Sequence, residues 1–313
     1  MGLSGALLIL LALAFAWSMG AHYTGACMGM PYATGSIGLR PALLVMAILV
    51  MTGASFLSHR VLLTVGRHVI EVDSLHPGAA AAIIAAAFFL TTLYNRLKIP
   101  TSTIQILVFA VAGAGLALHL RVQWLTIARL VVVWILAPLV AIALGWAFTL
   151  LLDHLPGFHG KAALAGKLLV AAGGLASLTM GANDVSNATA LFIPAHVSGL
   201  YAAGAIGGLG LAAGVLTWGR PLLERVAFEI VRVDLAMASA AQLVQGLVVL
   251  SAVVGLGDFT SMNQALVGAL LGAGLARGRN TVSWPVLKAI LKGWAVAPVS
   301  GLALAYLCAI TSR

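Results

Sequence analysis

The octapeptide Gly181-Ala182-Asn183-Asp184-Val185-Ser186-Asn187-Ala188 lies inside an apolar stretch that otherwise reads as membrane-spanning helix. Asp184 is the only carboxylate between Leu168 and Leu216. A charged side chain at bilayer depth is costly, so an intramembrane aspartate usually marks an ion or substrate path. Two asparagines and a serine supply oxygen ligands and amide donors within two helical turns, and glycine and alanine let backbones approach each other. The octapeptide therefore predicts a small-ion site in an interrupted membrane helix.

The composition places the whole chain in the membrane. Hydrophobic residues make up 62% of the 313 residues and charged residues 8%, whereas about a quarter of a soluble domain is charged. Apolar runs of about 17–25 residues recur from one end to the other, as in a polytopic helical protein. We therefore predict an all-α membrane protein, a single membrane domain with about ten transmembrane segments plus broken or re-entrant helices. The predicted spans are 3–19, 41–57, 78–94, 101–119, 124–151, 163–180, 199–217, 236–255, 260–276 and 285–310.

The net charge of +9 reflects topology rather than a nucleic-acid partner. Lysine and arginine lie in short loops beside the spans, where they act as orientation signals. With ten spans, five of the 17 basic residues fall on the side of the N-terminus and twelve on the other side. The positive-inside rule then places both termini outside the cytoplasm, in a multi-pass protein of the plasma membrane. The lipid bilayer is the expected environment, and no nucleic acid is expected as a partner.

The chain contains an internal repeat, found by matching segments that recur in the same order. The two halves, 1–152 and 153–313, hold five predicted spans each. Because five is odd, the second half crosses the membrane upside down relative to the first, as in many secondary transporters, which bind substrate near the midplane. The matching segments are Gly20-Ala21 with Gly181-Ala182 (161 residues apart), Thr64–Arg67 with Thr217–Arg220 (153), Thr101–Ala117 with Thr260–Ala276 (159), and Trp134 and Pro138 with Trp294 and Pro298 (160).

Each half carries two polar clusters inside otherwise apolar segments. Hydroxyls and amides at a helix N-terminus, with free backbone N–H groups, form a cradle for an anion. A nearby carboxylate supplies the countercharge for a coupling cation or proton, and Asp184 and Asn183 are the candidate Na⁺ ligands. Hydrogen bonding between helices is the alternative role for the serines and threonines. The candidate site residues are Asn183, Asp184, Ser186, Asn187, Ser261, Asn263 and Gln264 in the second half, and His22, Tyr23, Thr24, Ser102, Thr103 and Gln105 in the first.

At these residues the sequence resembles the inorganic phosphate transporter (PiT) family. Gly181–Ala188 is similar to the family signature Gly-Ala-Asn-Asp-Val-Ala-Asn-Ala and differs only at Ser186. Pro100–Gln105 resembles the family motif Pro-Val-Ser-Thr-Thr-His and keeps its proline, serine and first threonine. Proteins of this family are cation-coupled importers of an oxyanion. The resemblance implies that Asn183, Asp184 and Asn187 bind ion or substrate, and that Ser102, Thr103 and Ser261 are hydroxyl donors to the oxyanion.

The first half departs from the family pattern. His22-Tyr23 stands where phosphate carriers have Asn-Asp, and Ala26 replaces the later asparagine; Gln105 and Gln264 replace a histidine in both copies. One of two symmetry-related carboxylates is thus missing, which favours proton coupling or a reduced sodium stoichiometry. The imidazole of His22 titrates near neutral pH and could take part; packing against a neighbouring carbonyl is the alternative. The segment 27–32 also resembles a sulfate-carrying branch of the family.

The sequence therefore predicts a secondary active transporter, not an enzyme, that imports an inorganic oxyanion with H⁺ or Na⁺ and uses no other cofactor. Phosphate is favoured over sulfate because only phosphate retains a proton to donate to the Asp184 carboxylate at neutral pH. A sulfate permease of the same family is the first alternative, and a passive anion channel is the alternative from another class. An intramembrane aspartyl protease is disfavoured, because the Asp258 of its Gly-x-Gly-Asp motif falls at a span boundary. A homodimer is the assembly left open.

Overall fold

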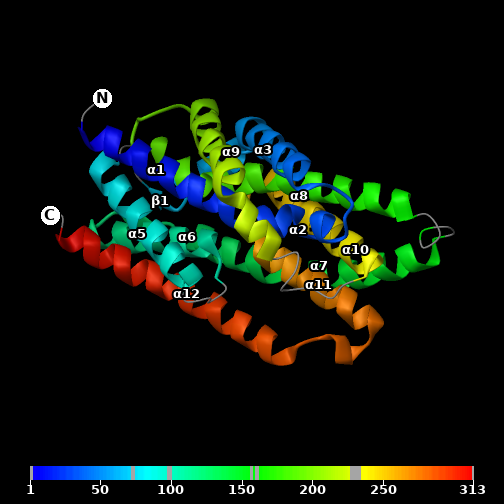
Figure 1. Ribbon diagram of the computed structural model, residues 1–313. Helices are drawn as coiled ribbons and strands as arrows, with labels where there is room; N and C mark the ends of the chain where they lie inside the picture. The colour runs from blue at the N-terminus through cyan, green and yellow to red at the C-terminus, as the bar shows by residue number, and fades with distance from the viewer. Residues whose placement is uncertain are drawn as a thin grey trace.

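The structure is a computed structural model that describes residues 3–71, 75–96, 101–155, 158, 162–225 and 234–311. Long helices run roughly side by side (Figure 1), as apolar segments must when no water is present to satisfy their backbone groups. Eight stretches in the described part of the chain are long and apolar enough to cross a membrane. The all-α, multi-pass class is thereby confirmed. The candidate spans are Leu3–Ala33, Leu39–Phe56, Pro77–Tyr94, Trp124–His154, Ala163–Phe192, Leu200–Pro221, Leu235–Leu256 and Leu287–Ile310.

Two of the ten predicted spans correspond to shorter helices. α6 (Thr103–Ala117) has 15 residues and α11 (Met262–Arg277) has 16. At 1.5 Å per residue they are about 22 and 24 Å long, short of the ~30 Å hydrocarbon core. Both begin in the interior, beside the buried side chains of Ser102 and Ser261. The structure thus has eight candidate spans where the sequence predicted ten, and α6 and α11 have the length expected of re-entrant helices.

A small strand pair, which the sequence did not predict, ties two helix ends together. Strands β1 (Ile70–Glu71) and β2 (Arg121–Val122) pair antiparallel, with Ile70 opposite Val122. Because β1 precedes α5 and β2 follows α6, the start of α5 and the end of α6 lie at the same end of the bundle, so α5 and α6 form a helical hairpin. The remaining elements are α1 (Leu3–His22), α2 (Thr24–Ala33), α3 (Leu39–Phe56), α4 (His59–Arg67), α5 (Pro77–Arg96), α7 (Trp124–His154), α8 (Ala162–Thr189), η1 (Ala190–Phe192), α9 (Leu200–Arg225), α10 (Leu235–Leu250), the π-helical η3 (Ser251–Leu256), η4 (Arg279–Thr281) and α12 (Trp284–Thr311).

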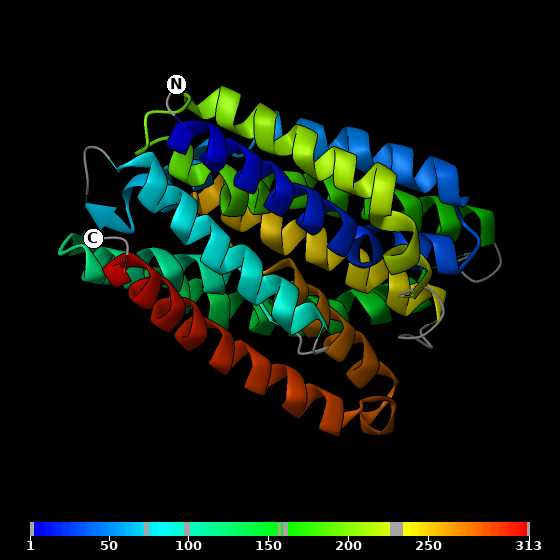
Figure 2. The same cartoon turned by 60° about the vertical axis from the view of Figure 1, so that its left-hand side comes forward.

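The helices of the two halves pack reciprocally. α1 lies along α9 and α3 along α8, while α6 lies along α12 and α11 along α7 (Figures 1 and 2). Glycines make the closest crossings: a Cβ on Gly20 would lie 2.0 Å from Leu211 O, and a Cβ on Gly181 would lie 2.0 Å from Val50 O. The two crossings are related by one offset. Gly20 lies 161 residues before Gly181, and Val50, which Gly181 meets, lies 161 residues before Leu211, which Gly20 meets. The inverted repeat and its boundary at residue 152 remain a prediction, which this reciprocity supports. Two further glycines, Gly53 against Leu178 O and Gly214 against Trp17 O, repeat the pattern at the same offset.

The helix break in the second half lies after the octapeptide rather than inside it. α8 continues through Asp184 to Thr189 and only then changes to η1. In the first half, hydrogen bonds from Tyr23 N to Met19 O and from Cys27 N to Tyr23 O, both 3.0 Å, continue across the α1–α2 junction. The predicted interruption within 181–193 is therefore present, but it lies at the C-terminal end of that segment and not at Asp184. The glycines that suggested it serve the close approach of neighbouring backbones instead of a turn.

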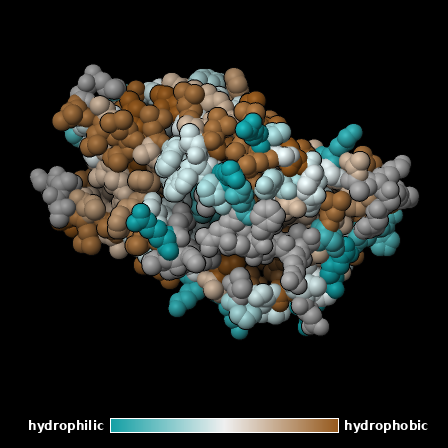
Figure 3. Space-filling model, viewed as in Figure 1, coloured by the Kyte–Doolittle hydropathy of each residue, from teal (hydrophilic) through white to brown (hydrophobic). Residues whose placement is uncertain are grey.

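The outer surface of the bundle is largely hydrophobic. Leu125 on α7 and Val299 on α12 expose 84% and 66% of their surface. Figure 3 shows hydrophobic side chains gathered on the upper and left-hand part of the visible face, with hydrophilic ones across its middle, lower edge and right-hand end. Both described ends of the chain lie at one end of the bundle (Figure 1). This surface suits contact with lipid, and the polar side chains inside the bundle are therefore the exception that marks the site.

Candidate ion and anion site

Asp184 is held between two asparagine amides on α8. Asn183 Nδ2 donates to Asp184 Oδ2 at 3.1 Å, and Asn187 Nδ2 donates to Asp184 Oδ1 at 3.3 Å. All three side chains are buried. In the part of the chain that the structure describes, Asp184 has no basic partner. The carboxylate is therefore oriented by neutral donors and keeps its charge available for a cation or proton.

The two asparagines also reach the interior ends of α6 and α11. Thr260 N donates to Asn183 Oδ1 at 3.0 Å, and Asn183 Nδ2 donates to Thr260 O at 2.8 Å, just ahead of α11. Asn187 Nδ2 donates at 3.4 Å to the hydroxyl of Thr103, the first residue of α6. Residues four apart on a helix are neighbours, with Cβ atoms about 5–6 Å apart. The starts of α6 and α11 therefore converge on the Asp184 face of α8.

Both short helices begin with the same serine cap. Ser102 Oγ accepts a hydrogen bond from Gln105 N at 3.5 Å, and Ser261 Oγ accepts one from Gln264 N at 3.3 Å. Such a cap satisfies one of the four N–H groups that every helix start leaves free. Free amides at the positive ends of two converging helix dipoles can hold an anion without a basic side chain. The amides of the first turns that have no acceptor among the described residues are those of Thr103, Ile104, Met262 and Asn263.

Tyr23 joins this cluster from the first half. Its hydroxyl lies 3.2 Å from Thr103 Oγ1, and it also interacts with the Asp184 carboxylate. The ring is buried. By the offset of 161 residues, Tyr23 occupies the first-half place that corresponds to Asp184. A neutral phenol thus stands opposite the carboxylate.

His22, Thr24, Ser186 and Asn263 are not brought to Asp184 by direct contact. The half-buried His22 ring stands edge-on to Tyr23, with centroids 5.1 Å apart. Thr24 Oγ1 donates to Gly20 O at 3.0 Å, and Ser186 Oγ donates to Asn183 O at 2.8 Å, so both hydroxyls serve their own helices. The half-buried Asn263 side chain makes no hydrogen bond to a described residue.

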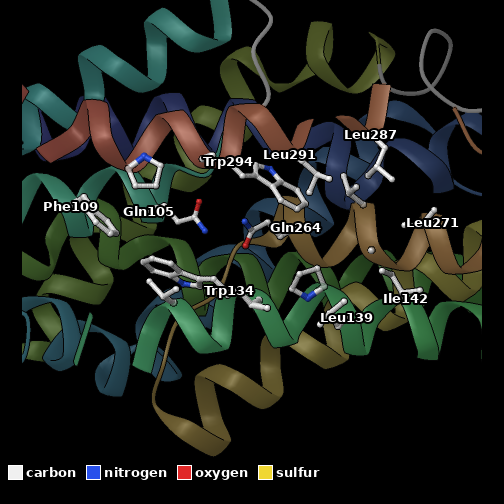
Figure 4. Close-up of a pocket in the computed structure, with 17 residues that line it drawn as sticks. Gln105, Phe109, Trp134, Leu139, Ile142, Gln264, Leu271, Leu287, Leu291 and Trp294 are labelled. Carbon is white, nitrogen blue, oxygen red and sulfur yellow. The ribbon is translucent and has the colours of Figure 1, made fainter. Parts of the chain in front are cut away.

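Gln105 and Gln264 lie on the other side of α6 and α11. Two residues along a helix turn the side chain by about 200°, so Gln105 points away from the face on which Thr103 meets Asn187. Figure 4 shows the two glutamines facing each other in a cavity of about 630 Å³ between α7 and α12. Their Oε1 atoms are buried and unpartnered. The rest of the lining is apolar or aromatic: Phe109, Val131, Trp134, Ile135, Pro138, Leu139, Ile142, Val267, Gly268, Leu271, Leu287, Leu291, Trp294, Ala295 and Pro298.

The sequence prediction missed two buried glutamines of α10. Gln242 and Gln245 lie in the predicted apolar span 236–255, and neither side chain is exposed. Gln242 Nε2 donates to Ala26 O at 3.0 Å and to Gln245 Oε1 at 2.7 Å. Two amides three residues apart in an otherwise apolar span are a detectable signal, but their partners follow only from the fold.

The oxygen atoms around Asp184 fit a small cation. Asn187 Oδ1 and Thr260 Oγ1 are buried and unpartnered, whereas Asn183 Oδ1 already accepts from Thr260 N. Hard cations take carboxylate, amide and hydroxyl oxygens as ligands. Asp184 and Asn183 stay the predicted Na⁺ ligands, and Asn187 supplies a further buried oxygen that has no hydrogen-bond partner. Among the described residues, no group of three or more His, Cys, Asp or Glu side chains could hold a metal ion.

The protease alternative requires two facing carboxylates, and its aspartates have different partners. Asp258 pairs with Arg129 at 2.8 Å, whereas Asp184 bonds the asparagines of α8. A Pro-Ala-Leu tripeptide of the protease type does occur, at 41–43, but it forms part of the first turns of α3. The arrangement therefore gives no support to peptide hydrolysis.

A membrane bundle in which two short helices start at one buried polar cluster is typical of membrane transporters. The phosphate transporter family model matches residues 19–165 and 158–305, and the chain belongs to this family. Its members are transporters, which agrees with the sequence prediction.

Known relatives carry names for two oxyanions. The chain is 31% identical over 314 residues to the sulfate permease CysP of Bacillus subtilis, covering 96% of this chain and 85% of the relative. It is 27% identical over 291 residues to a protein named as a phosphate permease from Methanocaldococcus jannaschii, covering 92% and 91%. A solved structure titled as a sodium-dependent phosphate transporter has the same fold, with a TM-score of 0.87, 22% identity, and coverage of 99% of this chain and 98% of that one.

Proposed function

We propose that this protein is a secondary active transporter of the plasma membrane that imports an inorganic oxyanion together with H⁺ or Na⁺. The convergence of the α6 and α11 starts on the Asp184 face of α8 carries the proposal. It places anion donors and a carboxylate in one buried cluster. A cation and an anion can then bind there at the same time.

The anion is held by backbone amides and hydroxyls. Ser102, Thr103 and Ser261 lie at the two helix starts, where the first-turn N–H groups are free. Helix N-termini bind tetrahedral anions through these groups and the helix dipole. No lysine or arginine is needed, which suits a dianion that must be released again.

Asp184 couples the two ions electrostatically. A bare carboxylate in a low-dielectric interior repels a dianion, and a bound Na⁺ or proton removes that repulsion. The anion therefore binds well only after the cation has bound. Asn183 and Asn187 keep the carboxylate aimed at the cluster.

The reciprocal helix pairs provide a route to alternating access. The α5–α6 hairpin belongs to one half and the α10–α11 pair to the other, and each short helix packs on the long final helix of the opposite half. Rocking one pair against the other exposes the same cluster to opposite sides in turn. In this arrangement both termini lie outside the cytoplasm, as the distribution of basic residues predicts.

Phosphate is the proposed substrate, and sulfate is the second candidate. Phosphate retains a proton that Asp184 accepts as a hydrogen bond, which sulfate cannot donate at neutral pH. Sulfate is favoured by a different observation: the relative with 31% identity is named as a sulfate permease. The two anions share charge and shape, so the helix starts alone do not select between them.

Uptake of labelled phosphate and of labelled sulfate into proteoliposomes tests the proposal. Inward gradients of Na⁺ or of protons should drive accumulation of one anion above its equilibrium level, and an excess of that unlabelled anion should block it. If the anion only equilibrates across the membrane, at a rate that neither gradient changes, the result would instead support a passive channel.

A further inference from the structure

In the first half, the position equivalent to Asn187 has no polar side chain. The glycine crossings relate α1 to α8 by 161 residues, and the same offset continued into α2 makes Ala26 the counterpart of Asn187. The starts of α6 and α11 are related by 159 residues, so Met262 corresponds to Thr103. In the second half Asn187 reaches across to Thr103. Ala26 and Met262 cannot repeat that contact, because neither has an amide or a hydroxyl.

Two glutamines of α10 fill this place. Gln242 Nε2 donates to Ala26 O at 3.0 Å and to Gln245 Oε1 at 2.7 Å, and Gln245 Nε2 donates to Met262 O at 3.4 Å. The two amides form a continuous bridge from α2 to the start of α11. Backbone oxygens that a small cation would need in this place already accept amide hydrogens.

The opposite half has no such bridge. By the offset of 159 residues, α5 carries Ile83 and Ala86 where α10 carries Gln242 and Gln245. Both are buried and have no donor to offer. On this side the side-chain Oδ1 of Asn187 is buried and has no partner. The two places thus differ. One has the unpartnered Oδ1 of Asn187 beside a carboxylate. In the other, the backbone oxygens of Ala26 and Met262 accept amide hydrogens, and the oxygen left unpartnered is Oε1 of Gln242.

We propose that Gln242 and Gln245 close the first-half counterpart of the Asp184 site with their own amides, so that each oxyanion is coupled to a single cation or proton. This inference rests on the proposed function. A primary amide offers two N–H donors without a charge, so it satisfies carbonyl oxygens as a cation does and needs no carboxylate nearby. Tyr23, in the place of a second aspartate, agrees with a site that has no cation to balance.

The cation dependence of uptake in the wild type and in Gln242→Glu tests this inference. The substitution replaces the Nε2 donor by a second oxygen, and so opens a place for a cation between Ala26 O and Gln245. The wild type should show a Hill coefficient for the coupling cation of about one, and the variant a coefficient clearly above one. Gln123→Glu, a half-buried residue just before α7, is the matched control and should keep the wild-type coefficient.

A coefficient of about two in the wild type overturns the inference. So does the wild-type coefficient in a Gln242→Glu protein that reaches the membrane normally; Gln245→Glu serves where Gln242→Glu is not produced. If neither anion is taken up, the proposed function is contradicted but the inference about Gln242 and Gln245 is not. Thermal unfolding in detergent then tests that inference. Sodium chloride, compared with choline chloride, should raise the Tm of Gln242→Glu more than that of the wild type, because a ligand that binds the folded state stabilises it. Equal responses overturn the inference.

Discussion

Asn183 holds Thr260 by both atoms of its amide: Oδ1 accepts from Thr260 N at 3.0 Å, and Nδ2 donates to Thr260 O at 2.8 Å. A side chain of the signature octapeptide thereby fixes the segment that leads into α11. The same Nδ2 also donates to Asp184. The position of an anion-binding helix start is thus linked directly to the orientation of the carboxylate.

Asn183→Ala should destabilise the protein as well as impair uptake. The substitution leaves the buried N–H and C=O of Thr260 without partners, and each such loss costs about 1–3 kcal/mol. The Tm in detergent should fall by several degrees. Asn263→Ala, which removes a half-buried amide with no partner among the described residues, should leave the Tm almost unchanged. Equal Tm values for the two variants would contradict this role of Asn183.

Gly181→Ala and Gly20→Ala should destabilise the protein to similar extents. Each added Cβ would lie 2.0 Å from a backbone oxygen of the crossing helix, Val50 O or Leu211 O. Overpacking of this kind typically costs about 1–3 kcal/mol. Gly255→Ala is the control, because nothing lies within 4 Å of its added Cβ. A normal Tm for both crossing variants would remove the support that these crossings give to the repeat.

The double variant Gln105→Leu, Gln264→Leu should keep the KM of the wild type. Both amides face the apolar cavity between α7 and α12 and not the Asp184 cluster. Their unpartnered Oε1 atoms give the variant no hydrogen bond to lose, so the Tm should not fall. A tenfold or greater rise in KM, about 1.4 kcal/mol of lost binding, would place the glutamines at the substrate after all.

His22→Ala should change the pH profile of uptake if His22 takes part in coupling, as we expect. Its ring contacts Tyr23, which in turn contacts Asp184. Uptake rates of the variant and the wild type over a broad range of pH provide the measurement. His154→Ala, on an exposed histidine at the end of α7, is the control. If His22→Ala has the same pH profile of uptake as the wild type, His22 has no role in coupling and serves only in packing.

The presence of the long helices and the all-α class can be predicted from the sequence, because few kinds of structure can span a bilayer. An apolar run such as 124–151 has to form a helix, and α7 spans Trp124–His154. The run 260–276 has the same composition signal, yet its first residues sit beside Asn183 in the interior. Depth in the membrane is a tertiary property, so the sequence did not distinguish α11 from a full span.

The candidate site was predicted in part, for reasons that differ from residue to residue. Asp184 and its neighbouring asparagines could be predicted because a charged residue in an apolar membrane helix is energetically costly and usually has a function. Gln105 was assigned to the site from its motif, but helical geometry turns it away from Thr103. The glycines of the octapeptide suggested a break, because glycine permits both turns and close helix crossings; which of these applies depends on Val50 across the interface.

The measurement that tests the central claim most directly is gradient-driven accumulation by Asp184→Asn in proteoliposomes. Asp184 is the carboxylate through which cation and oxyanion are coupled in this account, and asparagine keeps the shape but removes the charge. We predict that the variant folds and reaches the membrane but accumulates neither phosphate nor sulfate under Na⁺ or proton gradients. Asp234→Asn, which keeps a good N-cap for α10, should accumulate the anion as the wild type does. Accumulation at the wild-type level by Asp184→Asn would contradict the account.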